Sequence, residues 1–364
     1  MAVRKRIVVL APSSAYPPTD GGSQVTADIC NRLAKYATVK LLTNTQLNHP
    51  QNNNLNIVNF FSATRSKYVN LNTIFCLYKL FKTFRPHCCI LIQPFYFFPA
   101  YVISKLFRTK FVIYSLNLEF NRFSSLGRLW AGMLYPYEFL AYRSTQLTVF
   151  ISEKEQLSAI NLFRLPEERT AYLPHGIVFP SGSHNSAWAN NPHQYRIIFF
   201  GNLNYLPNRL AVELLVQEIA PRLGQYISTP YRIDIAGSGF EVDKYQHQTL
   251  NKLNISFLGF VDDLREFIIG ADLMLNPVQS GGGIQTKIID TVACGVTVVA
   301  SRTGSLGLPV SVFGKKLCIV NDNDWVGYCE STRDILRHTS RIPTPKQFFD
   351  HYNDEKVLEQ LLEM

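Results

Sequence analysis

The residues best suited to chemistry lie in the glycine-rich segment GGGIQTKIID, residues 281–290. The glycines leave room for a ligand, and a helix is predicted to begin directly after them. Lys287 and Asp290 are three residues apart and therefore share one face of that helix. A lysine and the amides of a helix N-terminus can neutralise a leaving diphosphate, and a carboxylate one turn later can accept hydrogen bonds from a ribose. The alternative interpretation is a solvated lysine–aspartate pair.

Glycines also mark the ends of other predicted strands. In the second half they occur within 200–202, 236–239 and 259–261, each directly after an apolar run. In the first half, the loop that follows the first strand ends in Gly21 and Gly22, where a helix is expected to begin. The exposed N–H groups of a helix start attract phosphate. The loop lacks the GxGxxG dinucleotide pattern, and each of these glycines is also compatible with a tight turn alone.

Both halves of the chain alternate short apolar strands with helical patterns, which is typical of a parallel sheet covered on both faces. In the first half we expect strands at 6–11, 38–43, 55–61, 88–92, 110–115 and 147–151, and helices near 23–36, 68–84, 97–107, 127–144 and 153–162. In the second half we expect strands at 195–201, 231–236, 254–258, 272–276, 296–301 and 317–320, and helices near 208–223, 241–252, 263–269, 285–294 and 322–337.

A stretch without periodicity, rich in Ser, Asn, Gly and Pro, separates the two halves at about 178–194. The sequence therefore predicts an α/β protein with two doubly wound Rossmann-like domains. Ligands of such sheets bind at the carboxyl ends of the strands, so we expect a cleft lined by these loops. The predicted boundaries are 1–180 for the first domain, 181–194 for the linker, 195–340 for the second domain and 341–364 for a C-terminal helical segment that packs back on the first domain.

Composition is consistent with a globular protein in a reducing compartment. Hydrophobic residues make up 46% of the chain and charged residues 17%. The seven cysteines show no framework spacing, so we interpret them as reduced core residues and expect a cytoplasmic location. Between Arg85 and Lys105 no residue is Asp, Glu, Lys or Arg, but Pro94 and Pro99 interrupt this stretch. A buried strand followed by a helix is therefore the better interpretation than a membrane span.

A metal site is not expected. The residues Asp322-Asn323-Asp324 match the DxD pattern of metal-dependent transferases, but they lie after a predicted strand and before a helix, where aspartate is a common N-cap. The histidines at 175, 184 and 193 have no ligand spacing.

The order of the glycine-marked segments resembles the donor domain of GT-B glycosyltransferases of the family 4 type, a large group of retaining enzymes. The resemblance is carried by FFGNLNYLPN, IDIAGSG, ISFLGFVDDL and ADLMLNPVQSGGGIQTKIIDTVACGVTVVAS followed by SLGL, within residues 196–308. In the first half YPPTDGG, SLNLE, VFISEKE and LPHG resemble the acceptor-domain landmarks of the same family. The resemblance extends over nearly the whole chain.

This resemblance implies transfer of a hexose from a nucleotide-diphosphate sugar to a polysaccharide, lipid-linked or similar acceptor, without a metal or other cofactor. Lys287 would hold the donor diphosphate, and Asp290 would take the place of the second Glu of the family's E-x7-E motif and bind the ribose. The catalytic candidates are Lys287, with Asn117 and Glu119 from the first domain. The other donor-binding candidates are Gly21, Gly22, Gly201, Asn202, Ser238, Gly239, Phe260, Val261, Gly283, Ile284, Gln285 and Thr286.

Three positions depart from the family pattern. The first Glu of the motif falls at Gly282, a usual second cation is Asn208, and the histidine of the common HNxE is Leu116. The alternative function is therefore a degenerate relative that binds a nucleotide-sugar or a protein partner without catalysis.

Charge is distributed unevenly along the chain. Residues 1–180 contain 20 lysines and arginines against 8 acidic residues, while residues 181–364 contain 16 against 19. A basic first half favours an anionic partner. The segment 67–85 mixes cations with aromatic residues and is either a helix at the inner face of a membrane or an ordinary helix packed on the sheet. No nucleic-acid motif is present, so nucleic acid is not an expected partner.

Overall fold

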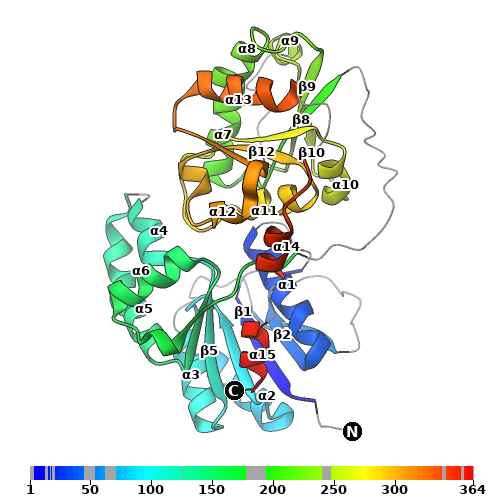
Figure 1. Ribbon diagram of the computed structural model, residues 1–364. Helices are drawn as coiled ribbons and strands as arrows, with labels where there is room; N and C mark the ends of the chain where they lie inside the picture. Colours follow the sequence, from blue (N-terminus) through cyan, green and yellow to red (C-terminus); the bar gives the residue numbers. More distant parts are fainter. Residues whose placement is uncertain are drawn as a thin grey trace. The chain divides into compact units, whose positions relative to one another are not determined.

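The computed structural model describes residues 4–12, 15–16, 18, 21–44, 54–61, 71–125, 127–177, 194–239, 247–337, 342–353 and 356–363. The chain forms two compact units. The first comprises Met1–Gly176 and Tyr352–Met364, and the second comprises Ile177–His351. Each unit is built on one parallel sheet with helices packed against it (Figure 1).

The sheet of the first unit has the order β3-β2-β1-β4-β5-β6-β7, with every neighbouring pair parallel. Its elements are β1 (Arg6–Ala11), α1 (Gly21–Tyr36), β2 (Thr38–Thr43), β3 (Leu55–Asn59), α2 (Leu71–Phe84), β4 (Cys88–Ile92), α3 (Phe97–Leu106), β5 (Lys110–Ser115), α4 (Glu119–Ser125), the 3-10 helix η1 (Leu129–Met133), α5 (Leu134–Arg143), β6 (Leu147–Phe150), α6 (Glu153–Phe163), η2 (Glu167–Arg169), β7 (Thr170–Tyr172) and α15 (Lys356–Glu363). The strand order changes direction at β1, so the topological switch point lies between β1 and β4.

The core of the first unit explains why its strands are apolar throughout. One cluster joins Leu77 and Phe81 of α2, Phe97 of α3 and Phe163 of α6 to strand residues such as Phe111. Helix α1 is absent from this cluster and packs instead with β2 and β3. The sheet is therefore covered on both faces, as a buried parallel sheet requires.

The second unit has the sheet order β10-β9-β8-β11-β12-β13, again with parallel neighbours. Its elements are β8 (Tyr195–Phe200), α7 (Leu206–Leu214), the π-helical turn η3 (Leu215–Ile219), α8 (Ala220–Leu223), β9 (Tyr231–Ala236), α9 (His247–Lys252), β10 (Ile255–Gly259), α10 (Leu264–Ile269), β11 (Leu273–Asn276), α11 (Thr286–Ala293), β12 (Thr297–Ser301), η5 (Thr303–Ser305), α12 (Val310–Phe313), η6 (Gly314–Lys316), β13 (Leu317–Val320), α13 (Trp325–Arg337) and α14 (Lys346–Tyr352). The switch point lies between β8 and β11.

A buried ion pair connects β8 and β9 in the second unit. Arg196 of β8 donates from Nε to Asp234 of β9 over 2.6 Å and from an amino group to the carbonyl of Phe267 over 2.7 Å. Its backbone N–H donates to the carboxylate of Asp272 at the start of β11. The Arg196 side chain is 2% exposed and that of Asp234 is 4% exposed, and Asp234 also pairs with the half-exposed Arg232 over 3.3 Å. The buried guanidinium therefore depends on Asp234 for its counter-charge.

The fold class predicted from the sequence is confirmed: two parallel sheets, each combined with helices. Strand β7 was not predicted, because three residues are too few to show a pattern. The predicted helix 127–144 is divided into η1 and α5, and the short helix α4 precedes it. Cys76 is exposed on α2 and Cys294 and Cys318 are half-buried, so the interpretation of all seven cysteines as core residues was wrong at Cys76 and holds fully only for the other four. The described part of the chain contains no helix with the length and apolar character needed to cross a membrane.

Candidate donor site

The carboxyl edge of the second sheet brings the predicted glycine-marked turns together. The N–H of Gly201 donates to the carbonyl of Ala236, and that of Gly237 donates to the carbonyl of Gly259. The turn that follows β8 is joined to the turn that follows β9, since the N–H of Leu203 donates to the carbonyl of Ser238. These bonds join the loops after β8, β9 and β10 along one edge of the sheet. The loops contain six of the twelve second-domain candidates: Gly201, Asn202, Ser238, Gly239, Phe260 and Val261.

Two glycines in these turns leave no room for a side chain. A Cβ on Gly237 would lie 1.9 Å from the carbonyl oxygen of Gly201, which no side chain can tolerate. A Cβ on Gly201 would lie 2.8 Å from the side-chain nitrogen of Asn208 and 3.0 Å from Nζ of Lys287. Both glycines also have positive φ angles. The turn after β8 therefore lies directly beside the lysine that the sequence singled out.

Lys287 is held by uncharged partners. Its Nζ donates to Oδ1 of Asn208 over 2.6 Å and lies 4.4 Å from the centre of the Phe199 ring. Asn208 in turn donates to the carbonyl of Asn202. Lys287 is only 8% exposed, and within the described chain it forms no ion pair. The alternative of a solvated pair with Asp290 is therefore wrong.

Burial without a carboxylate partner changes the acidity of this lysine. Desolvation penalises the ammonium form and lowers the pKa of Lys287 to about 7. An unfolded lysine titrates near 10.4, so between these two values the unfolded chain holds more protons and stability rises with pH. The full penalty for the buried charge is present below about pH 7. An anion beside Nζ would relieve that penalty, which makes this position well suited to bind a phosphate group.

The glycine-rich segment leads into α11 as the sequence predicts. Residues 283–286 are half-buried, and α11 begins at Thr286 with no side chain capping its first turn. A Cβ on Gly281 would lie 2.9 Å from the hydroxyl of Tyr205, so this glycine lets the segment pass close to the turn after β8. Asp290 is half-buried on the same helix as Lys287. Gly283, Ile284, Gln285, Thr286 and Asp290 therefore belong to the same edge of the second unit.

In the first unit, Asn117 and Glu119 form part of a buried network. The side-chain amide of Gln93 donates to Asn117 over 2.8 Å and to Glu119 over 3.0 Å, and Asn117 donates to Glu119 over 3.1 Å. Glu119 also pairs with Arg122 over 3.1 Å. Asn117 is 8% exposed and Glu119 2%. These two residues fix the turn at the carboxyl end of β5.

Two members of this network were missed by the sequence analysis. Gln93 directly follows β4 with a positive φ of 62°, which is a strained conformation for a residue with a side chain. The carboxylate of Glu138 accepts the N–H groups of both Glu119 and Phe120 at the start of α4. Burial raises the pKa of Glu138 to about 7. A polar residue at the end of a buried strand was a visible signal for Gln93, whereas Glu138 joins the network only through tertiary packing.

The remaining predicted residues have simple structural positions. Gly21 and Gly22 begin the 16-residue helix α1, whose first turn contains no acidic residue. Asp324 accepts the N–H of Gly327 and caps α13, while Asp322 accepts bonds from Thr303, so both aspartates of the DxD pattern are engaged. Among the described residues, no group of His, Cys, Asp and Glu could hold a metal ion. Metal independence itself stays a prediction.

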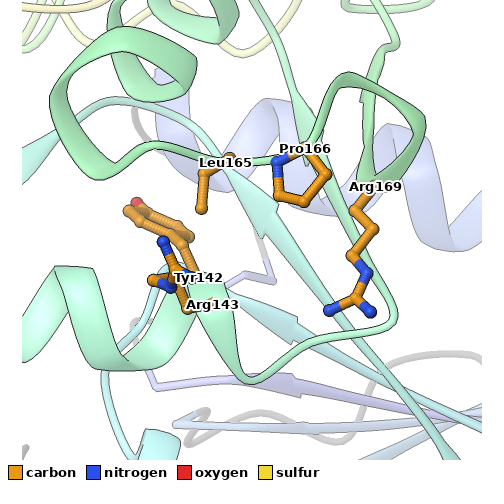
Figure 2. Close-up of a pocket in the computed structure, with 5 residues that line it drawn as sticks. All are labelled: Tyr142, Arg143, Leu165, Pro166 and Arg169. Atoms are coloured by element: carbon orange, nitrogen blue, oxygen red, sulfur yellow. The ribbon is translucent and has the colours of Figure 1, made fainter.

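A small hollow lies elsewhere, in the first unit (Figure 2). Its lining residues are Tyr142, Arg143, Leu165, Pro166 and Arg169. The Arg143 guanidinium donates a hydrogen bond to the carbonyl of Arg164, so it already has a partner within the protein. The hollow contains none of the predicted site residues, so we do not connect it with donor binding.

Comparison with known proteins agrees with this geometry. Residues 194–338 match the family model Glycosyl transferases group 1. No curated protein matches the sequence significantly. Among solved structures, sucrose-phosphate synthase from Thermosynechococcus elongatus superposes with a TM-score of 0.70 at 14% identity, covering 99% of this chain and 98% of that one. HepE from Anabaena, in complex with UDP and glucose, gives 0.68 at 13% identity, covering 99% and 100%.

A third structure is WaaG, a glycosyltransferase involved in lipopolysaccharide biosynthesis, with a TM-score of 0.66, 15% identity and coverage of 98% and 97%. At such identities the structural likeness establishes the fold. The chain therefore has the GT-B fold of two Rossmann-like units. Residues 194–338 match the glycosyl transferases group 1 model, which supports a glycosyltransferase and confirms the resemblance seen in the sequence.

Proposed function

We propose that this protein is a retaining, metal-independent glycosyltransferase that moves a hexose from a nucleotide-diphosphate sugar to a polysaccharide, lipid-linked or similar acceptor. The observation that carries the proposal is Lys287, at the switch point of the second unit: it is a buried lysine that pairs with no carboxylate among the described residues. Its charge is available to a ligand because its partners, Asn208 and the Phe199 ring, are neutral. A diphosphate leaving group needs such a cation when no metal supplies the charge.

Two of the similar structures support the two proposed substrate classes. HepE from Anabaena was solved in complex with UDP and glucose, and also with UDP-glucose, which favours a nucleotide-diphosphate sugar as donor here. WaaG is involved in lipopolysaccharide biosynthesis, which favours a saccharide or lipid-linked acceptor. In this proposal the second unit binds the donor, and the first unit provides the acceptor site, where Asn117 and Glu119 are the candidate polar groups.

A thermal-shift screen followed by donor hydrolysis tests the proposal. A nucleotide-sugar at 100 times its dissociation constant should stabilise the protein by roughly 2.7 kcal/mol. The enzyme should then release free nucleotide slowly in the absence of acceptor. Stabilisation without any release would favour the degenerate, binding-only alternative, and no stabilisation by any nucleotide-sugar would contradict donor binding.

Donor binding should be coupled to proton uptake at Lys287. A nucleotide-sugar has no phosphate group that titrates near neutral pH, so its negative charge should raise the lysine pKa from about 7 in the free protein. Donor affinity should therefore decrease as pH rises above about 7, because Lys287 is then neutral in the free protein and the free energy of protonating it is subtracted from the binding free energy. Calorimetry in two buffers of different ionisation enthalpy measures the protons taken up. Uptake that persists unchanged in Lys287→Met would assign the proton to another group.

Asp290 should act in donor binding rather than in the chemical step. A ribose contact is similar in the ground and transition states, so Asp290→Asn should mainly raise the donor KM. Steady-state kinetics with varied donor measure this effect. A collapse of kcat at unchanged KM would argue for a direct catalytic role.

Activity should survive chelation, since Lys287 replaces the charge that a divalent cation supplies in other transferases. The measurement is turnover with and without EDTA. Loss of activity that Mn²⁺ restores would instead favour a metal site, with the DxD segment as the first place to search.

An anionic membrane surface is a further proposed partner of the basic first unit. Helix α2 has features of both alternatives predicted for segment 67–85. Phe81 is buried in the core, as expected of a helix packed on the sheet, whereas Phe75 is 60% exposed beside Lys79, as expected of a helix at a membrane surface. Lys67 and Tyr68 lie outside the described residues. Attraction between cations and anionic lipids should weaken with salt.

A further inference from the structure

Besides Phe75 of α2, the first unit exposes apolar side chains on η1 and α5, which follow α4 along the chain. Figure 1 labels α4 and α5 on the same side of this unit. Leu129 is fully exposed, Met133 is 76% exposed, Leu140 is 57% exposed and Trp130 is 46% exposed. A single exposed leucine needs no explanation, but four large apolar side chains within twelve residues form a patch. We call Leu129, Trp130, Met133 and Leu140 the η1–α5 patch.

The patch is not the result of a poorly packed helix. Ala131, Leu134, Ala141 and Tyr142 of the same segment are 7% exposed or less and hold it against the rest of the unit. The outward positions Met133, Pro136 and Leu140 recur at spacings of three and four, so they lie on one face of α5. The segment is therefore apolar both toward the core and toward the outside, and the outer face is left for a partner.

Charge around the patch identifies the kind of partner. Between residues 119 and 143 the two carboxylates, Glu119 and Glu138, are buried. The charged side chains that reach solvent are all arginines: Arg122, Arg128 and Arg143. Arg122 also lies 4.4 Å from the Phe123 ring, which packs against Trp130 at 4.6 Å. Within residues 119–143, the apolar side chains and the tryptophan are therefore accompanied at the surface only by cations, which matches an anionic bilayer surface.

We infer that the η1–α5 patch inserts into the interface of an anionic membrane, with Trp130 at the headgroup level and Arg128 on lipid phosphates. The inference rests on the membrane association proposed above and names the surface responsible. Helix η1 packs against α4, which begins at Glu119 beside the carboxyl end of β5. Docking through the patch therefore places the acceptor-side candidates Asn117 and Glu119 close to the lipid surface, as a lipid-linked acceptor requires.

Vesicle sedimentation with two matched double variants tests the inference. Vesicles of phosphatidylcholine alone and of phosphatidylcholine mixed with phosphatidylglycerol are compared at low salt. Leu129→Asp with Met133→Asp should weaken binding to the mixed vesicles by about tenfold or more. The control, Phe75→Asp with Leu106→Asp, changes two other exposed apolar side chains, on α2 and α3, and should bind as the unmodified protein does.

A fluorescence measurement follows the patch directly. The chain has three tryptophans, so Trp188→Phe with Trp325→Phe leaves Trp130 as the only reporter. Its emission should shift to the blue with mixed vesicles and remain unchanged with phosphatidylcholine alone. Arg128→Glu should reduce the preference for the mixed vesicles.

Three results would overturn the inference. The patch variant could bind as tightly as the unmodified protein, the α2–α3 control could lose as much binding, or the patch could mediate dimerisation in sedimentation velocity without vesicle binding. Donor hydrolysis, measured on every variant without lipid, separates this inference from the proposed function. Normal nucleotide release without vesicle binding would contradict the membrane inference and support the proposed transferase function. Patch-dependent vesicle binding without nucleotide release would support the membrane inference and contradict the transferase function.

Discussion

Lys287→Ala should lower turnover by about 10²-fold or more, because it removes the cation proposed to stabilise the departing diphosphate. Lys287→Met preserves the buried volume and should show the same loss. Its thermal stability should be equal or higher near neutral pH, since the folded protein no longer has to desolvate a lysine. Turnover and melting temperature, measured on the same preparations, check both expectations. Near-normal turnover in either variant would remove Lys287 from the mechanism.

Lys316 provides a matched control for this experiment. It is a second fully buried lysine of the same unit, and its Nζ donates to the carbonyl of Gly295 beyond the other end of α11. Lys316→Met should therefore reduce stability and leave turnover per folded molecule unchanged. Opposite patterns at two buried lysines would distinguish a functional cation from a structural one.

Asp234→Ala should destabilise the second unit by about 3–5 kcal/mol, because it leaves the Arg196 guanidinium buried without its carboxylate. The Arg196 guanidinium would retain its contacts with the carbonyl and ring of Phe267, which carry no negative charge, and the Arg196 backbone N–H would still donate to Asp272. Chemical denaturation followed by tryptophan fluorescence measures the loss, with Trp325 of α13 as a reporter in this unit.

The comparison variant is Arg222→Ala, which breaks a half-exposed pair with Glu218. Removing an ion pair near the surface should cost about 1 kcal/mol or less. Similar losses for the two variants would mean that burial of the Arg196 pair does not determine its contribution.

The sequence by itself determined the fold class and most of the strands. Strands 88–92 and 110–115 are buried on both faces of a parallel sheet, so nearly all of their residues are apolar. Such continuous apolar runs could be recognised as strands in the sequence. Glycines at the strand ends could be recognised too, because a Cβ at Gly201 or Gly237 would lie closer than 3.0 Å to a neighbouring atom. Local chemistry therefore predicted where the donor loops lie along the chain.

Only the tertiary structure decided the state of the side chains within those loops. Lys287 and Asp290 look like a solvated pair in the sequence, yet packing against Phe199 and Asn208 buries the lysine and leaves it without a counter-charge. Desolvation depends on residues 79 or more positions away, so no local pattern contains it. The same is true of Glu138, which reaches α4 from the facing helix, and of the η1–α5 patch, whose apolar residues resemble core residues until the packing shows which face is covered.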